Sequence, residues 1–164
     1  GTHDYLHEFV ELPESSREIQ ITIGKDRTYI DELRAYSGSV PSSVQKWNDP
    51  YEEADLLAIS THSDDECLFL GGAIVIAVDQ GYRVQVAYYC DFYQTEQYRR
   101  HELLDGLWEM GVTHYPQLGR FMDEYSTDLE TARSQVDYDE VLEYMVETIR
   151  RVKPQVLVSQ DFEG

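Results

Sequence analysis

Cysteine is scarce in this chain of 164 residues, which contains only Cys67 and Cys90. Two cysteines form neither the dense disulfide framework of a small secreted domain nor a C-x-x-C metal pair. The chain also lacks an opening segment with the basic, apolar and small-residue order of a signal peptide. The sequence therefore leaves the compartment open between a cytoplasmic and a secreted location.

Positive charge is equally scarce, because 13 Lys and Arg residues stand against 32 Asp and Glu residues, for a net charge of −19. Nucleic acid and anionic membrane surfaces would repel such a chain. No apolar run is long enough to span a bilayer, so we expect no membrane insertion. A small molecule or a glycan is the expected partner, and the sequence leaves the oligomeric state open.

The amino-terminal part, residues 1–46, has a β-like pattern. Alternating or β-branched residues at 17–23 and 27–37 flank a Gly-Lys-Asp turn, which predicts paired strands over residues 18–36. A Gly, Ser and Pro-rich linker follows at 37–43. So short a piece buries little apolar surface, and we expect weak independent stability.

Strand-like and helix-like segments alternate in the remainder, residues 47–164. Apolar strands are expected at 54–60, 83–90 and 155–161, with helices at 67–81, 95–111 and 138–153. This alternation predicts an α/β, Rossmann-like three-layer domain with a mostly parallel sheet, preceded by the small β-rich segment. In such folds the site lies at the carboxyl ends of the strands.

The segment His-Ser-Asp-Asp-Glu at 62–66 directly follows the first of these strands. Acids at the start of a helix also serve as caps, so the pattern alone does not require a metal. His62 and Asp65, three positions apart, can converge on one ion while Asp64 faces elsewhere, and imidazole with carboxylate is a zinc-type donor set. A metal-dependent phosphoesterase would usually need more carboxylates and a phosphate clamp.

Several motifs follow in a fixed order: H-x-D-D-E, a Gly pair, a V-x-V strand, R-x-x-E-x-x-x-G-x-x-x-M-G-V at 99–112, and a helix ending in Lys-Pro before a strand ending in Asp. From Trp47 onward this order resembles the PIG-L/LmbE-type zinc-dependent N-deacetylases. The motif usually reads A-H-P-D-D-E in that family, whereas Thr61 and Ser63 stand here for its Ala and Pro.

The resemblance implies removal of acetyl from an N-acetylated amino sugar such as N-acetylglucosamine, or from its conjugate. It implies that His62 and Asp65 hold Zn²⁺ or another divalent metal and that Asp64 is the general base. Arg99 and Asp123 would then face the substrate. Alternatively, Arg99 forms a solvated ion pair with Glu102 on its helix, and Asp123 is an ordinary surface acid.

The family takes a third zinc ligand from a late H-x-x-H segment, which does not occur before Gly164. We therefore expect the chain to be the amino-terminal portion of a deacetylase domain. With two zinc ligands, it should hold zinc weakly and release no acetate above background. The alternative function is a non-catalytic carbohydrate-binding or scaffolding fragment of the same fold.

Overall fold

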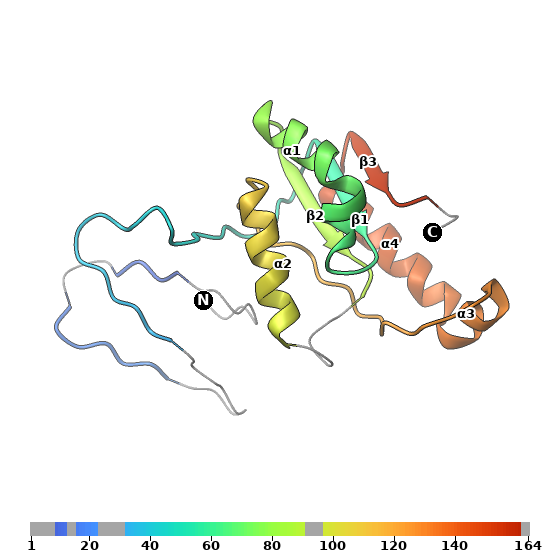
Figure 1. The fold of residues 1–164 in the computed structure, drawn as a ribbon, viewed down its shortest axis with the longest axis horizontal. Helices are drawn as coiled ribbons and strands as arrows, with labels where there is room; N and C mark the ends of the chain where they lie inside the picture. The colour runs from blue at the N-terminus through green and yellow to red at the C-terminus, as the bar shows by residue number, and fades with distance from the viewer. Residues whose placement is uncertain (1–8, 13–15, 23–31, 91–96, 162–164) are drawn as a thin grey trace.

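The computed structural model describes residues 9–12, 16–22, 32–90 and 97–161. Three strands, β1 (Leu56–Ser60), β2 (Val84–Tyr88) and β3 (Val156–Ser159), form one parallel sheet in the order β2-β1-β3 (Figure 1). Leu56 pairs with Val84 on one side and with Val156 on the other. The predicted α/β fold with a parallel sheet is confirmed.

The helices surround this sheet. They are a π-helix η1 (Glu66–Leu70), α1 (Gly71–Asp79), α2 (Gln97–Glu109), α3 (Leu129–Gln135) and α4 (Tyr138–Val152). After α1 and α2, Gly81 and Gly111 have φ of 80° and 82°, the left-handed conformation that closes a helix and favours glycine. Within the described residues, no helix has both the length and the apolar character needed to cross a bilayer.

Alternate side chains of the strands enter two separate apolar clusters. Ala58 and Val86 pack in the cluster that contains residues of α1 and α2, whereas Leu57 and Ile59 pack with Val152 of α4. Because successive side chains of a strand point to opposite faces, α1 with α2 and α4 cover the two faces of the sheet. The expected three-layer arrangement is therefore present.

β1 is the central strand, and the connections that lead to its two neighbours, β2 and β3, lie on opposite sides of it. The chain passes from β1 through η1 and α1 to β2 on one side, and later returns through α4 to β3 on the other side (Figure 1). Connections that diverge in this way leave a crevice at the carboxyl end of the central strand. Residues 61–66 lie at that end, so the fold places the predicted motif where ligands bind in such sheets.

An irregular extended stretch, residues 115–121, runs beside β2. The Tyr88 N–H donates to the Gln117 carbonyl at 2.8 Å, and the Gln117 N–H donates to the Val86 carbonyl at 3.0 Å. A Cβ on Gly119 would overlap the Tyr89 carbonyl oxygen, so only glycine permits this close approach. The stretch brings Asp123, which follows it, to the same edge as the end of β2.

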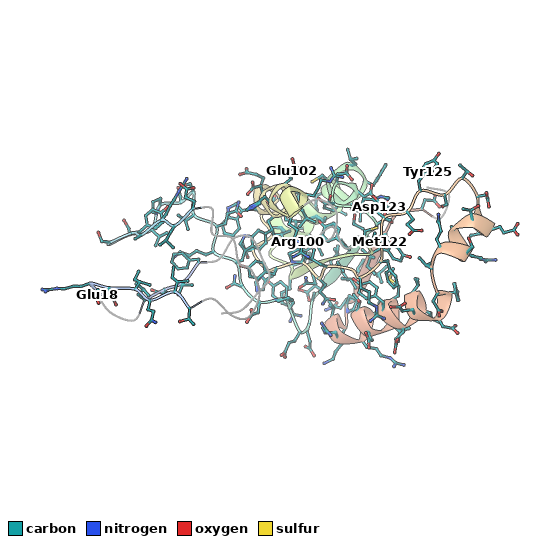
Figure 2. All side chains as sticks on the ribbon, turned by 90° about the horizontal axis from the view of Figure 1, so that it is seen from below. Glu18, Arg100, Glu102, Met122, Asp123 and Tyr125 are labelled. Carbon is teal, nitrogen blue, oxygen red and sulfur yellow. The ribbon has the colours of Figure 1, made fainter. Side chains whose placement is uncertain are left out.

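The expected paired strands of the amino-terminal part are not seen in its described residues. Residues 16–22 and 32–46 carry no strand, and the expected turn at 24–26 lies outside the described residues. Ile21 and Leu33 are 50% and 68% exposed, so the described residues offer little apolar contact that would stabilise a hairpin there. Figure 2 shows Glu18 far from the helices.

Regular packing begins at Trp47. Its ring stacks on Tyr115 and meets Trp108 edge-on, with centroid distances of 5.4 Å in both pairs. The Asn48 N–H donates to the Thr113 carbonyl at 2.9 Å. Trp47 and Asn48 therefore attach the amino-terminal chain to the α/β layers. The domain boundary near residue 47 stays a prediction.

Candidate active site

The loop after β1 holds His62 in a defined orientation. The Ser60 hydroxyl donates to the His62 carbonyl at 2.8 Å, and the His62 backbone N–H donates to Asp65 Oδ2 at 3.0 Å. Asp65 is buried, with 7% of its surface exposed. These two hydrogen bonds fix the backbone on either side of the imidazole, so the first turn after the strand presents the ring to the crevice.

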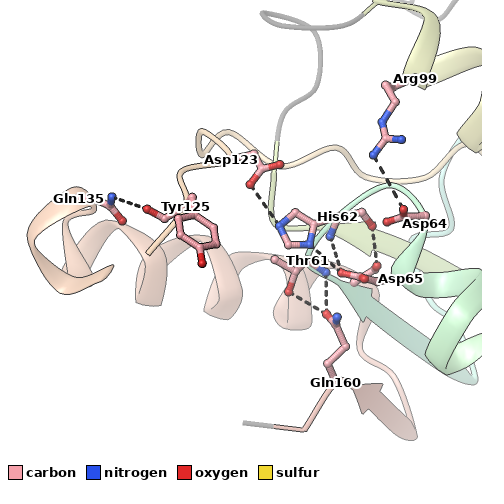
Figure 3. Close-up of polar contacts among 10 residues, drawn as sticks. Thr61, His62, Asp64, Asp65, Arg99, Asp123, Tyr125, Gln135 and Gln160 are labelled. Carbon is pink, nitrogen blue, oxygen red and sulfur yellow. Dashed lines mark hydrogen bonds and ion pairs between the residues drawn. The ribbon is translucent and has the colours of Figure 1, made fainter. Parts of the chain in front are cut away.

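The two nitrogens of the His62 ring face two different carboxylates. Nδ1 lies 3.0 Å from Asp65 Oδ2, and Nε2 lies 3.3 Å from Asp123 Oδ1 (Figure 3). Asp123 belongs to the loop between the 115–121 stretch and α3, and Figure 2 shows it beside Met122 on that loop. The fold thus brings three of the sequence-predicted site residues, His62, Asp65 and Asp123, into one cluster.

Asp64 lies outside this cluster, although it is adjacent to Asp65. Its side chain is 54% exposed, and its Oδ2 lies 3.9 Å from Nη2 of Arg99 in α2 (Figure 3). The two neighbouring acids therefore have different surroundings, one enclosed against the imidazole and one open to solvent beside a guanidinium. Arg99 and Asp64 together line the open side of the site.

Glu66, the last acid of the motif, faces inward. It is 1% exposed, and burial raises the pKa of its carboxyl, an effect opposed in part by a hydrogen bond from its own backbone and by the Cys67 thiol, which donates to Oε1 at 3.3 Å. Its Oε2 has no hydrogen-bond partner within the described part of the chain. Glu66 is therefore enclosed in the interior and does not face the solvent.

A residue outside the predicted set, Cys90, also reaches the cluster. One ligand atom each from His62, Cys90 and Asp123 lie within 4.8 Å of one another. Burial, together with the charges of Asp123 and Asp65, raises the pKa of the Cys90 thiol to about 12. Its sequence signal was its position as the last residue of the expected strand 83–90, at the rim where the site was expected.

Gln160, which follows β3, closes the site from the other side. Its Oε1 accepts hydrogen bonds from the Thr61 backbone N–H at 2.9 Å and from the Thr61 hydroxyl at 2.7 Å (Figure 3). Thr61 replaces the alanine that is usual at this point of the motif, and its hydroxyl supplies the second bond. The end of β3 is therefore tied to the residue that precedes His62.

The pair of His62 Nδ1 and Asp65 Oδ2 fits a zinc-type ion. Imidazole nitrogen and carboxylate oxygen each bind zinc at ~2.0–2.2 Å, so two ligands of one tetrahedral ion stand about 3.3 Å apart. The observed separation of 3.0 Å is that of a hydrogen bond and is about 0.3 Å shorter than this ligand spacing. The same two atoms can thus hold an ion between them or bond each other without one.

Comparisons with known proteins agree with these motifs. The profile of the family described as PIG-L: GlcNAc-PI de-N-acetylase matches residues 57–164. No curated protein sequence matches the chain significantly.

Solved structures similar to the chain include a deacetylase-bog complex from the biosynthesis pathway of teicoplanin, at 23% identity and a TM-score of 0.48, covering 63% of this chain and 54% of that one. The zinc-inhibited form of teicoplanin deacetylase Orf2 has 21% identity and a TM-score of 0.49, with 63% and 55% covered. The conserved protein TT1542 from Thermus thermophilus has 20% identity and a TM-score of 0.47, with 63% and 45% covered. The chain spans about half the length of these structures.

Proposed function

The chain belongs to the PIG-L: GlcNAc-PI de-N-acetylase family, and from this premise we propose that it is an amide hydrolase that removes the acetyl group from an N-acetylated amino sugar or its conjugate. One observation carries the proposal: the adjacent acids of the motif are separated, with Asp65 against the imidazole and Asp64 in the open beside Arg99. Such a division gives one acid a binding role and leaves the other free for proton transfer.

His62 and Asp65 are the residues that would hold Zn²⁺ or another divalent metal, and their observed separation supports this assignment. When bound, Zn²⁺ supplies a Lewis acid that polarises the acetamide carbonyl and brings the pKa of water toward ~7. The hydrogen bond from the His62 backbone N–H to Asp65 holds the carboxylate in place for this role.

Asp64 is proposed as the general base that accepts a proton from the attacking water. Its exposed carboxylate can reach a water at the crevice, and the Arg99 guanidinium lies 3.9 Å from it on the same side. A positioned general base contributes ~10²–10⁴-fold to the rate of such reactions. Arg99, on the same open side, is proposed to contact the substrate.

Asp123 is proposed to accept hydrogen bonds from sugar hydroxyl groups. Its side chain is 53% exposed, and one oxygen faces His62 Nε2. The carboxylate therefore has room for a ligand on its outer side. An acidic rim of this kind, on a chain with a net charge of −19, favours neutral or cationic substrates over phosphorylated ones.

The test compares Asp64→Asn with Asp79→Asn, a control at an exposed acid at the end of α1. In a full-length version, we expect Asp64→Asn to retain the metal content of its parent and to lose acetate release from N-acetylglucosamine derivatives by ~10²-fold or more. The control should change neither quantity. An Asp64→Asn variant that keeps most of the activity would refute the role of this residue, and sugar binding without any acetate release by the full-length parent would favour the non-catalytic alternative.

A further inference from the structure

The second nitrogen of His62 takes part in a cluster that the proposed hydrolysis does not use. Nε2 points away from Asp65, toward Asp123 at 3.3 Å, and the Cys90 sulfur completes a group whose ligand atoms lie within 4.8 Å of one another. Each member comes from a different stretch of the chain: the loop after β1, the segment just beyond β2, and the loop after residues 115–121. We propose that these three atoms form a second cation position, selective for thiophilic divalent ions such as Cd²⁺ and Zn²⁺.

The donor set determines which cations this position takes. A thiolate sulfur and an imidazole nitrogen select zinc-like and softer ions, whereas Mg²⁺ and Ca²⁺ require oxygen ligands. The 3.3 Å between Nε2 and Oδ1 is already close to the separation of two ligands on one zinc ion. Binding releases the Cys90 thiol proton to solvent, so that the sulfur coordinates as a thiolate and the charges balance.

The electrostatic surroundings favour a cation at this point. The carboxylates of Asp65 and Asp123 lie 3.0 Å and 3.3 Å from the two nitrogens of the His62 ring, so two acidic groups flank the position. A divalent ion bound there is attracted by both of them. Asp123 is half exposed and His62 is 40% exposed on its side chain, so an ion enters from the open side of the crevice.

The two cation positions are linked through the proton of one imidazole ring. An ion on Nε2 requires the lone pair of that nitrogen, so the ring proton then sits on Nδ1 and is donated to Asp65 Oδ2. The tautomer that binds a metal through Nδ1 is the opposite one. A ring that keeps one proton can bind a metal through only one of its nitrogens. An ion on Nε2 therefore excludes a metal from the pair of Nδ1 and Asp65, and a thiophilic ion inhibits the proposed hydrolysis. This last consequence rests on the proposed function, whereas the cation position itself does not.

The experiment titrates the chain with Cd²⁺ alone and follows the ultraviolet absorption of cadmium–thiolate bonds. We expect one saturable band in the parent chain and in Cys67→Ser, a matched control at the exposed cysteine, and no band in Cys90→Ser. Asp123→Asn, a change at an exposed side chain that spares the core, should weaken the apparent affinity at least about tenfold. The Asp123→Asn variant keeps the test decisive if Cys90→Ser, a change at a buried position, fails to fold.

Absence of the band in the parent chain, its loss in Cys67→Ser, or an unchanged affinity in Asp123→Asn would each overturn the assignment. Acetate release is measured in parallel on full-length versions of the same proteins, with each normalised to its own activity without Cd²⁺. The parent chain should be inhibited at lower Cd²⁺ concentrations than Cys90→Ser. If no protein releases acetate, the proposed hydrolysis fails while the absorption band still decides the cation position.

Discussion

Replacing Gln160 by Leu should destabilise the chain more than the loss of one surface amide would suggest. The Gln160 side chain accepts two hydrogen bonds from Thr61, at 2.9 Å and 2.7 Å, and both residues are partly buried. A hydrogen bond contributes ~0.5–1.5 kcal/mol net, and a donor left without a partner adds a desolvation cost. Water reaches this rim in part, so we expect Gln160→Leu to lower the free energy of unfolding by about 1–2 kcal/mol.

Thr61→Val removes only the hydroxyl bond, since the backbone N–H still donates to Gln160, and should cost about 0.5–1 kcal/mol. In the double variant the valine should cost almost nothing more, because its bond is already absent, and the two changes should couple by about 0.5–1 kcal/mol. Urea unfolding followed by circular dichroism measures all three values. Gln155→Leu is the control, since this glutamine at the other end of β3 makes an exposed bond of 3.3 Å to Asp55. Strictly additive effects, or a Gln160→Leu cost equal to that of the control, would refute the reasoning.

Three further outcomes are expected. Gly119→Ala should force residues 115–121 away from the Tyr89 carbonyl at a cost of about 1–3 kcal/mol, visible as a lower Tm and faster hydrogen exchange at Gln117. Leu57→Ala, in the fully buried centre of β1, should cost about 2–5 kcal/mol in urea unfolding. Hydrogen bonds from Arg83 lower the pKa of Asp55. The stabilisation they give is present above the pKa of Asp55 in the unfolded chain and is lost as pH falls through its pKa in the folded chain. Asp55→Asn should therefore reduce the free energy of unfolding at pH 7 and flatten the decline of that free energy below about pH 4.

The order of strands and helices after Trp47 could be predicted because local signals agree with the tertiary fold. The apolar runs of β1 and β2 are long enough to be buried, and glycines mark the ends of α1 and α2 at positions 81 and 111. Helix α3 was not predicted, since none of its residues is buried and it has no apolar face to give a period. Its start depends on Asp128, whose side chain accepts a hydrogen bond from the Thr131 N–H.

The amino-terminal strands show the opposite case. Alternation at residues 17–23 satisfies the local rule for a strand, but a strand also needs a neighbour and a surface to cover, and exposed Ile19 and Ile21 have neither in the described chain. Alternating residues report which conformation a segment tolerates. They do not report whether a partner is present.

The residues of the site also differ in how far the sequence could predict them. Four of its members, His62, Asp64, Asp65 and Arg99, came from motifs in which spacing and order carry information. Cys90 has no motif of its own; the parallel pairing of β1 with β2, continued by the hydrogen bond from the Cys90 N–H to the Thr61 carbonyl, brings it to the imidazole. Asp123 was expected at the substrate from the family resemblance, whereas its contact with Nε2 depends on the path of residues 115–121.

That path also sets the time at which the cluster is complete during folding. His62, Cys90 and Asp123 belong to separate stretches, and each junction closes a loop of the chain before its contacts form. The β1–α1–β2 unit can assemble from contacts that are near in sequence, but Asp123 reaches the imidazole only after residues 115–121 have docked beside β2. A thiophilic ion bound to all three residues would therefore report the arrival of that stretch, and stopped-flow absorption of the metal–thiolate bond would time a late step of folding separately from the collapse of the core.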